Sequence, residues 1–376
     1  MQKKIYSSFV LITLLALFAC SKDVVMKPAA LSNFQPTAVV NKQWSNSVNM
    51  VKGAYLKLSP IAANNKIFIA GTSGNIKAID TNTGNTLWQV NTKMSLSSGP
   101  GINNTAVFVG TSDGQIIALQ QQDGKILWQG NVIGDVLAAP AANNETVVVK
   151  TSVGKIRAFN TRTGKVLWDY AEQNPSLSLR GSSAPKIVDD QVICGFANGE
   201  MVALDIDNGS VKWQQQIATP NGSFEVERMV DIVADPVVSG STIYVVTYQG
   251  NIAALNIKNG NILWQKPMSS ISGLSFDTQN IYVTNSHDQL FALTKSDGDT
   301  IWHYDGFAYR GLSGPATLGN VVAVGDTEGY VHWLNTANGQ IAARTKISGS
   351  IVVTPITYNN ALYVYSTTGN LVKFTK

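Results

Sequence analysis

Short runs of apolar residues, separated by glycine, asparagine, aspartate and serine, recur along the chain with a period of about 40 residues. The best-matched copy begins at Ile67 and reads IFIAGTSGNIKAIDTNTGNTLW. Seven further copies begin at Val107, Val147, Val192, Ile243, Ile281, Val322 and Leu362. Self-similarity at a fixed period is the signature of a repeat protein. The chain is therefore built from eight related units.

Each copy predicts strands rather than helices. In the first copy, the runs IFIAGT, NIKAID and TLWQV are rich in β-branched and aromatic residues and are bounded by turn residues. A further strand is expected around a proline seven residues before the copy begins. This proline is present in seven copies, as Pro60, Pro100, Pro140, Pro185, Pro236, Pro315 and Pro355, and Leu274 replaces it in the sixth. Because proline donates no hydrogen bond to a sheet, we expect it at a strand start.

Three other positions repeat with the same period. A glycine seven residues after the start predicts a tight turn with positive φ, and Asp288 replaces it in the sixth copy. A second glycine follows at position seventeen, as Gly84, Gly124, Gly164, Gly209, Gly260, Gly298 and Gly339. Position twenty-one is Trp88, Trp128, Trp168, Trp213, Trp264 and Trp302, and then Ala343. Position eleven is alanine in six copies, which suits closely packed sheets.

Four antiparallel strands per copy, repeated eight times, predict an all-β protein, an eight-bladed β-propeller. A β-helix of the same period is the main alternative, but the meander turns favour blades. Burying a tryptophan removes about 150–250 Å² from water, which is worth about 4–6 kcal/mol before entropy. We therefore expect the tryptophan row to pack between blades; the alternative is a tryptophan-lined cofactor site.

The ring is expected to close through the N-terminal strand. The eighth copy ends at Lys376 after its third strand, so it lacks its last strand. Trp44 lies 16 residues before Pro60, a spacing similar to that of the other tryptophans. We therefore expect residues 39–47 to supply the missing strand of the last blade, which would remove the exposed edges between the two chain ends.

The first residues resemble an export signal. Lys3 and Lys4 precede an apolar run, Ile5 to Ala19, that is too short for a comfortable membrane span. The run ends in LFAC, which resembles a bacterial lipoprotein signal with Cys20 as the acylated residue; ordinary secretion is the alternative. We therefore expect a signal peptide at 1–19, a tether at 20–38 and the propeller at 39–376. Ser21 after the cysteine suggests outer-membrane sorting.

Charge and chemistry point away from several functions. Loss of Lys3 and Lys4 lowers the formal net charge from +4 to +2, so no strong field for nucleic acid remains. The three histidines (His287, His303 and His332) occupy unrelated repeat positions, and Cys194 fits a small core residue. We find no haem, metal, phosphate-loop or nucleophile motif. The sequence therefore predicts neither an enzyme nor a cofactor.

Two connections between copies are unusually long, at residues 174–185 and 221–236, and they flank the fourth copy. The first carries Leu177, Leu179 and Arg180, and the second carries Glu225, Glu227, Asp231 and Asp235. Long loops with apolar and charged residues on a rigid scaffold usually bind a partner. The alternative is that the leucines fold back onto the ring and the acidic residues are solvated.

At these residues the chain resembles a known family. The blades are similar to pyrroloquinoline-quinone-type propeller repeats, and the whole chain resembles the BamB family of outer-membrane β-barrel assembly lipoproteins. The most specific segments are NPSLSLRG (174–181), GSFEVERMVDIVADPVV (222–238) and VGDTEGYVHWLN (324–335).

The resemblance implies a non-enzymatic scaffold at the periplasmic face of the outer membrane, attached only by its N-terminal lipid. It implies docking on the POTRA domains of BamA, within an assembly that includes the other machinery subunits. The partner-binding residues would be Leu177, Leu179 and Arg180 of the first connection, and Glu227, Arg228 and Asp231 of the second. The family often has another aspartate where this chain has Val233. Edge pairing with nascent barrel proteins is a further implied role.

Two other classes remain as alternatives. One is a quinone-dependent dehydrogenase with the same blade type, which by resemblance would carry a calcium site, long loops over the ring centre and often a disulfide between adjacent cysteines. The other is a ligand-sensing propeller.

Overall fold

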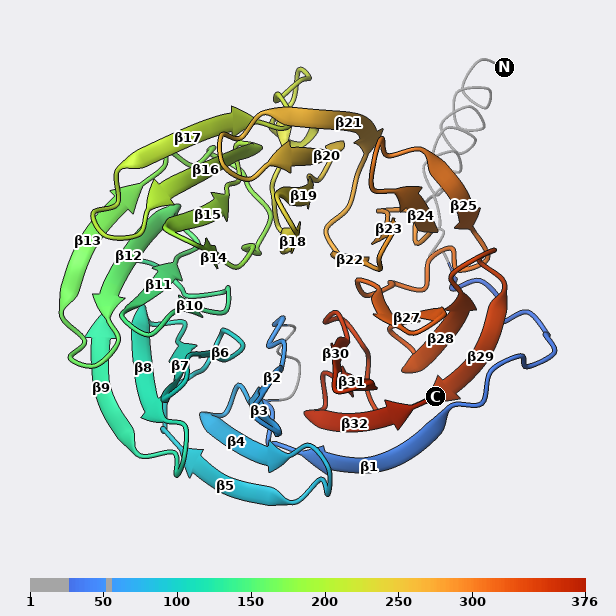
Figure 1. The fold of residues 1–376 in the computed structure, drawn as a ribbon, viewed down its shortest axis with the longest axis horizontal. Coiled ribbons are helices and arrows are strands. Elements are labelled where there is room, and N and C mark those ends of the chain that lie inside the picture. The colour runs from blue at the N-terminus through green and yellow to red at the C-terminus, as the bar shows by residue number, and fades with distance from the viewer. Residues whose placement is uncertain (1–26, 52–55) are drawn as a thin grey trace, which may run out of the picture.

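The computed structural model describes residues 27–51 and 56–376. These residues form eight antiparallel sheets of four strands, arranged as blades around a central opening (Figure 1). The prediction of an eight-bladed all-β propeller is confirmed. We name the strands of each blade A to D, from the ring centre outward.

The A strands are β2 (Ile61–Ala63), β6 (Gly101–Ile102), β10 (Ala141–Ala142), β14 (Lys186–Val188), β18 (Val237–Ser239), β22 (Leu274–Phe276), β26 (Ala316–Leu318) and β30 (Ile356–Tyr358). The B strands are β3 (Lys66–Ala70), β7 (Ala106–Gly110), β11 (Thr146–Lys150), β15 (Gln191–Gly195), β19 (Thr242–Val246), β23 (Asn280–Thr284), β27 (Val321–Gly325) and β31 (Ala361–Tyr365).

The C strands are β4 (Asn75–Asp80), β8 (Gln115–Gln120), β12 (Lys155–Asn160), β16 (Glu200–Asp205), β20 (Gly250–Asn256), β24 (Leu290–Thr294), β28 (Tyr330–Asn335) and β32 (Asn370–Thr375). The D strands are β5 (Thr86–Asn91), β9 (Ile126–Asn131), β13 (Val166–Ala171), β17 (Val211–Gln216), β21 (Ile262–Met268), β25 (Thr300–Tyr304), β29 (Ile341–Lys346) and β1 (Asn41–Ser47). A short 3-10 helix, η2 (Glu225–Arg228), precedes β18.

The repeated residues occupy the places that their chemistry requires. Each of the seven prolines immediately precedes an A strand, as expected for a residue without an amide hydrogen. Gly74 has a φ of 91° in the turn between strands B and C, and Asp288 has a φ of 58° at the same position of the sixth blade. The carboxylate of Asp288 accepts hydrogen bonds from the amides of Gly311 and Leu312. This non-glycine residue therefore holds the connection that follows blade 6.

The tryptophans join neighbouring blades, as predicted. The indole of Trp88 donates to the carbonyl of Gln121 in the next blade at 3.0 Å, and the other five repeat tryptophans make the equivalent bond. Each ring also lies on the glycine at position seventeen of the next blade: a Cβ on Gly124 would come within 2.7 Å of Trp88. This glycine is therefore required by the packing between blades as well as by its turn.

Blade 7 reaches a similar packing with the two residues exchanged. In six blades an alanine of strand C pairs with the tryptophan of strand D, as Ala78 pairs with Trp88. In blade 7, Trp333 of strand C pairs with Ala343 of strand D. Trp333 is fully buried and packs edge-on against Phe374 of blade 8. The loss of tryptophan from position twenty-one is thus compensated on the neighbouring strand.

The N-terminal strand closes the ring. Strand β1 pairs antiparallel with β32, and the sheet order is β1-β32-β31-β30. Trp44 donates to the carbonyl of Thr81 in blade 1 at 3.1 Å, and a Cβ on Gly84 would lie 2.6 Å from its ring. Trp44 therefore acts as the missing tryptophan of blade 8, and the predicted closure is confirmed.

The core is formed mainly by the B strands, which are almost entirely buried, and by the C strands, most of whose residues are buried. Cys194 is one of them; its burial raises the pKa of the thiol to about 12, as expected for an inert core residue.

The two faces of the ring differ in their connections. Because the strands alternate in direction, the D-to-A connections and B-to-C turns share one face, which we call the D–A face. The A-to-B and C-to-D turns lie on the opposite C–D face.

Removal of the closing strand should destabilise the whole ring. Trp44→Ala removes the indole hydrogen bond and the packing on Gly84, so we expect a loss of about 3 kcal/mol in the free energy of unfolding. Urea denaturation should show a lower midpoint and an unchanged slope. Deletion of residues 39–47 should lower the stability further. Gln35→Ala, at an exposed residue, serves as the control. A deletion variant with the same stability as the intact protein would contradict this closure.

Candidate functional site

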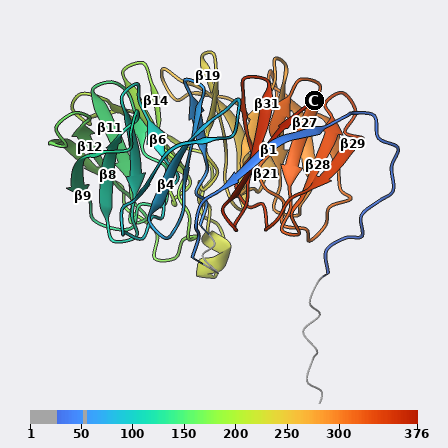
Figure 2. The same ribbon diagram turned by 90° about the horizontal axis from the view of Figure 1, so that it is seen from below.

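The two long connections lie side by side on the D–A face. The first loop (residues 174–185) joins β13 to β14, and the second loop (residues 221–236) leads into β18 and contains η2. The hydroxyl of Ser176 donates to the Glu225 carboxylate at 2.9 Å and joins their outer parts. In Figure 2 the short helix projects beyond one side of the ring. The two long connections therefore form one continuous surface on this face of the ring.

Asp231 holds the first loop from below. Only 2% of this residue is exposed, and its Oδ1 accepts a hydrogen bond from the amide of Leu179 at 2.8 Å. Burial raises the pKa of its carboxyl group, and the hydrogen bond from Leu179 opposes that rise. Its second oxygen has no hydrogen-bond partner among the described residues. In this structure Asp231 therefore orders the first loop rather than presenting a charge to solvent.

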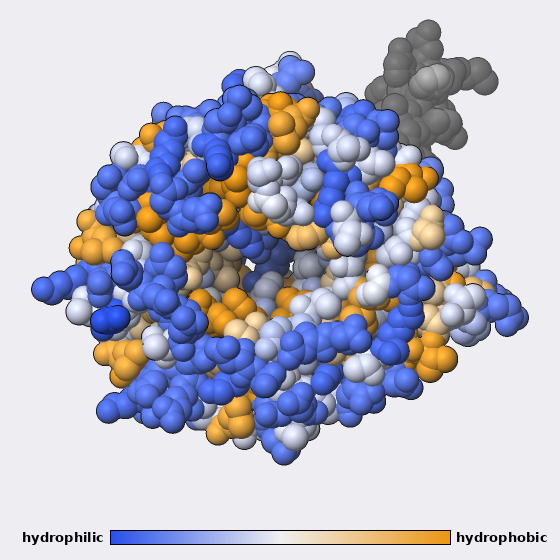
Figure 3. Space-filling view, viewed as in Figure 1, coloured by the Kyte–Doolittle hydropathy of each residue, from blue (hydrophilic) through white to orange (hydrophobic). Residues whose placement is uncertain are grey.

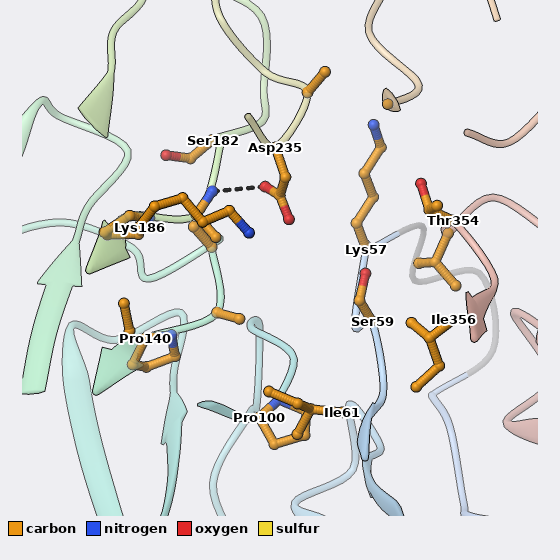
Figure 4. Close-up of a pocket in the computed structure, with 18 of the residues that line it drawn as sticks. Lys57, Ser59, Ile61, Pro100, Pro140, Ser182, Lys186, Asp235, Thr354 and Ile356 are labelled. Atoms are coloured by element: carbon orange, nitrogen blue, oxygen red, sulfur yellow. Dashed lines mark hydrogen bonds between the residues drawn. The ribbon is translucent and has the colours of Figure 1, made fainter. Parts of the chain in front are cut away.

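Two neighbouring residues of the second loop support the first loop in other ways. Asp235 accepts a hydrogen bond from the amide of Ala184 at 2.7 Å, the dashed line in Figure 4. Val233 is buried, and its Cγ1 would lie 2.6 Å from a Cβ on Gly181. Val233, at the position where the resemblance implies an aspartate, thus makes an apolar contact under the first loop.

A buried lysine lies beneath the same loop. Lys150, at the end of β11, donates to the carbonyl of Gly195 and lies 3.3 Å from the Ser183 hydroxyl. Its ammonium lies 5.2 Å from the centre of the Phe196 ring. Burial lowers the pKa of Lys150 to about 8. The lysine links blades 3 and 4 where the first loop crosses between them.

The outer surface of the loop pair is apolar and charged. In the first loop, Leu177 is 42% exposed, Arg180 is exposed and Leu179 is half-buried. Arg228 and Glu227 are exposed on η2. The Glu227 carboxylate accepts hydrogen bonds from the amides of Ser223 and Phe224, so it also caps its own turn.

Sequence reasoning missed two residues of this surface. Phe224 is 69% exposed and Val226 is 55% exposed, both at the second loop beside Glu225. Their alternation with acidic residues in SFEVER was an available signal, because large apolar side chains in a long loop have no blade to cover them. We use the name docking surface for a candidate binding surface made of Leu177, Leu179, Arg180, Phe224, Val226 and Arg228.

The centre of the ring forms a second candidate site. A cavity of about 500 Å³ is lined by residues in the A strands and just before them, including Pro100 and Pro140. Figure 4 shows Lys57 and Lys186 on different sides of this space, near Asp235. Figure 3 shows the opening on a mostly hydrophilic face of the ring. The Lys57 ammonium donates to the carbonyl of Ile271 at 2.6 Å, so it is already engaged within the protein.

The described residues hold no group of three or more histidine, cysteine or acidic side chains placed to bind a metal ion. His287 and His303 are exposed on blade 6, whereas His332 is buried in blade 7. No helix within residues 27–51 and 56–376 has the length and apolar character needed to cross a bilayer. Cys20, the predicted lipid site, lies outside the described residues.

The comparisons with known proteins agree with one another. The family model described as outer membrane protein assembly factor BamB matches residues 72–304. The chain is 45% identical over 365 residues to outer membrane protein assembly factor BamB of Pseudomonas aeruginosa, covering 96% of each chain. It is 32% identical to the protein of the same description in Escherichia coli K12, over the full length of both.

Solved structures give the same result. The crystal structure of BamB from Moraxella catarrhalis matches with a TM-score of 0.83 and 27% identity, covering 90% of this chain and all of that one. A europium-containing methanol dehydrogenase matches with a TM-score of 0.75 at 15% identity, covering 90% of this chain and 93% of that one, which reflects a shared fold alone. On the family model and the near full-length relatives, the chain belongs to the family of the outer membrane protein assembly factor BamB.

Proposed function

We propose that this assembly factor is a periplasmic scaffold lipoprotein that docks on the POTRA domains of BamA through the docking surface. Family membership gives the chain a role in outer-membrane protein assembly within the barrel assembly machinery, and its relatives are assembly factors rather than catalysts. The proposal of docking on BamA rests on one observation. The two interlocked loops expose apolar side chains that the fold does not cover.

The contacts between the two loops order the docking surface before any partner binds. The amide of Leu179 is fixed by Asp231 and that of Ala184 by Asp235, while Val233 packs against Gly181. A loop that is already ordered loses little conformational entropy when a partner binds. The rigid ring beneath it serves the same purpose, because it places both loops without further rearrangement.

The composition of the surface fits a protein partner. Leu177 and Phe224 offer apolar anchors, and Arg180 and Arg228 offer cations that can pair with acidic groups of the partner. Interfaces draw most of their binding energy from a few such apolar and arginine side chains surrounded by weaker contacts. We therefore assign binding to the loops and support to the blades.

The anchor belongs to the same proposal. Cys20, as the acylated first residue of the mature chain, would hold the ring at the periplasmic face of the outer membrane. Plain secretion is the alternative, and mass spectrometry of the mature N-terminus separates the two.

A second candidate role is edge pairing with nascent barrel proteins. The D strands are the outermost strands of the blades, and the residue before the tryptophan is an exposed leucine at Leu87, Leu127, Leu167 and Leu263. On blade 7 the chain's own N-terminal segment covers this edge: the amides of Thr37 and Ala38 donate to the carbonyl of Ala342. Extended segments can therefore lie on a blade edge, which favours binding of this kind elsewhere on the ring.

Charge reversal and truncation on the first loop should weaken docking without unfolding the ring. Arg180→Glu and Leu177→Ala should each weaken capture of purified BamA periplasmic domains by about tenfold or more, because interface anchors of this kind are worth about 1.4 kcal/mol or more. Matched controls are Arg162→Glu, on a C-to-D turn, and Leu127→Ala, on β9. Capture that both loop variants retain in full would move the docking face elsewhere.

Phe224 offers an independent test of the second loop. Phe224→Ser removes a large apolar side chain that makes little contact with the ring, so the free energy of unfolding should stay within about 0.5 kcal/mol. Capture of the BamA periplasmic domains should fall in the same assay. Leu263→Ser on β21, a similarly exposed residue, should leave capture unchanged. Equal capture by the two variants would exclude Phe224 from the interface.

Asp231 should stabilise the protein by ordering the first loop. Asp231→Ala leaves the amide of Leu179 unpaired. It should therefore lower the free energy of unfolding by about 1–3 kcal/mol and increase the rate of hydrogen exchange in residues 174–185. Asp231→Asn keeps an oxygen acceptor and should cost less. Because burial raises the folded-state pKa above the usual 3.8, protonation of Asp231 stabilises the fold, and this contribution is lost as pH rises through the folded value. Urea titrations across this range should lack that dependence in Asp231→Asn.

A further inference from the structure

The N-terminal segment before β1 is bound along the outer wall of the ring. Strand β1 starts on the C–D face, because it runs antiparallel to β32, which ends there. Going backwards from β1, the amides of Thr37 and Ala38 donate to Ala342 of β29. The amide of Ala29 donates to the carbonyl of Ala308, in the connection between blades 6 and 7 on the D–A face, at 2.8 Å. Residues 29–38 therefore cross the full height of blade 7.

Two arginines hold this segment in place. Arg310 is 2% exposed; it pairs with Asp326 at 2.7 Å and donates to the carbonyl of Ala29 at 2.8 Å. Arg344 donates to the carbonyl of Ser32 at 3.1 Å. The guanidinium of Arg344 also lies 5.0 Å from the centre of the Phe34 ring, a cation–π distance.

The arginines are themselves fixed by a buried histidine. Nε of Arg344 donates to Nδ1 of His332 at 3.2 Å, so Nε2 of His332 carries the proton and donates to Asp326 at 2.9 Å. Burial lowers the pKa of His332, which keeps the ring neutral and able to accept this bond. The network is thus a built clamp around three residues of the segment: Ala29, Ser32 and Phe34.

We propose that this clamp sets which face of the ring is turned toward the membrane. Without it, the chain would leave the ring at β1 on the C–D face, opposite the docking surface. With it, the chain leaves at Ala29 on the D–A face, and Figure 2 shows the described chain ending on the same side of the ring as the 3-10 helix. The inference rests on the proposed function, in which Cys20 carries the lipid and the two loops bind BamA.

The clamp also shortens the tether. From Cys20 to Ala29 there are nine residues, which span at most about 32 Å, whereas the 21 residues from Cys20 to Asn41 would span about 75 Å. The clamped ring therefore stays close to the bilayer, with its docking surface on the membrane-proximal side.

The clamp is tested first on the protein without lipid. Hydrogen exchange of the peptide covering residues 29–38 should be slow in the parent chain and in Gln35→Ala, and at least tenfold faster in Phe34→Ala and Arg344→Gln. Phe34→Ala changes only the segment, so folding of the ring is preserved even if Arg344→Gln unfolds blade 7. Exchange of this peptide at the rate of an unstructured chain in the parent protein would overturn the proposal.

The face of the ring that is turned toward the membrane is then identified by energy transfer. The measurement uses the acylated full-length protein in phospholipid vesicles that contain an energy-acceptor lipid. Donor dyes are placed at Asp113→Cys in a B-to-C turn or at Gln122→Cys in a C-to-D turn, two exposed residues on opposite faces of blade 2. Transfer should be several-fold greater from position 113 than from position 122, and Phe34→Ala should reduce the difference. Equal or reversed transfer from acylated protein would overturn the inference.

The two proposals fail separately. Capture of BamA periplasmic domains by unlipidated Phe34→Ala should equal that of the parent, because the docking surface is untouched. Mass spectrometry of Cys20 reports on the anchor: a mature protein without acyl chains would overturn both the anchor and the sidedness assigned to it, while the capture assay would still test docking.

Discussion

Seven of the eight blade interfaces depend on a tryptophan ring placed over a glycine of the next blade. The indole ring needs the glycine because a Cβ there would overlap it, and its N–H satisfies a carbonyl in the turn beside that glycine. Burying such a ring is worth about 4–6 kcal/mol before entropy, and a closed ring multiplies this contact around its circumference. Where the order changes, in blade 7, Trp333 and Ala343 exchange places across the strand pair. Packing volume is thus kept although the local sequence is not.

The N-terminal residues have two structural roles in the closed ring. Strand β1 completes blade 8 through Trp44, and the segment before it covers the edge of blade 7. Both are long-range contacts, since they join the beginning of the chain to its last third. Here the two longest connections interlock through Asp231, Asp235 and Val233.

The docking surface illustrates how a supporting residue can resemble a binding residue. Asp231 belongs to the residues that the family resemblance marks for binding, yet its side chain is buried and holds the amide of Leu179. Glu227 likewise caps its own turn while remaining exposed. Leu177, Arg180 and Phe224 remain exposed. The acidic residues of the second loop thus shape the surface, and in the proposed function the apolar and cationic residues supply its contacts.

The sequence by itself determined the number of blades, the strand order within each, the strand that closes the ring and the two connections that stand out. These features follow from local periodicity, because proline, glycine and tryptophan each satisfy a requirement that repeats at a fixed spacing. The tertiary structure decided what periodicity does not encode. It placed Asp231 beneath the first loop, exposed Phe224 and Val226, exchanged Trp333 with Ala343, and bound residues 29–38 across blade 7. Each of these depends on contacts between residues distant in sequence, whose burial and partners are fixed only when the ring has closed.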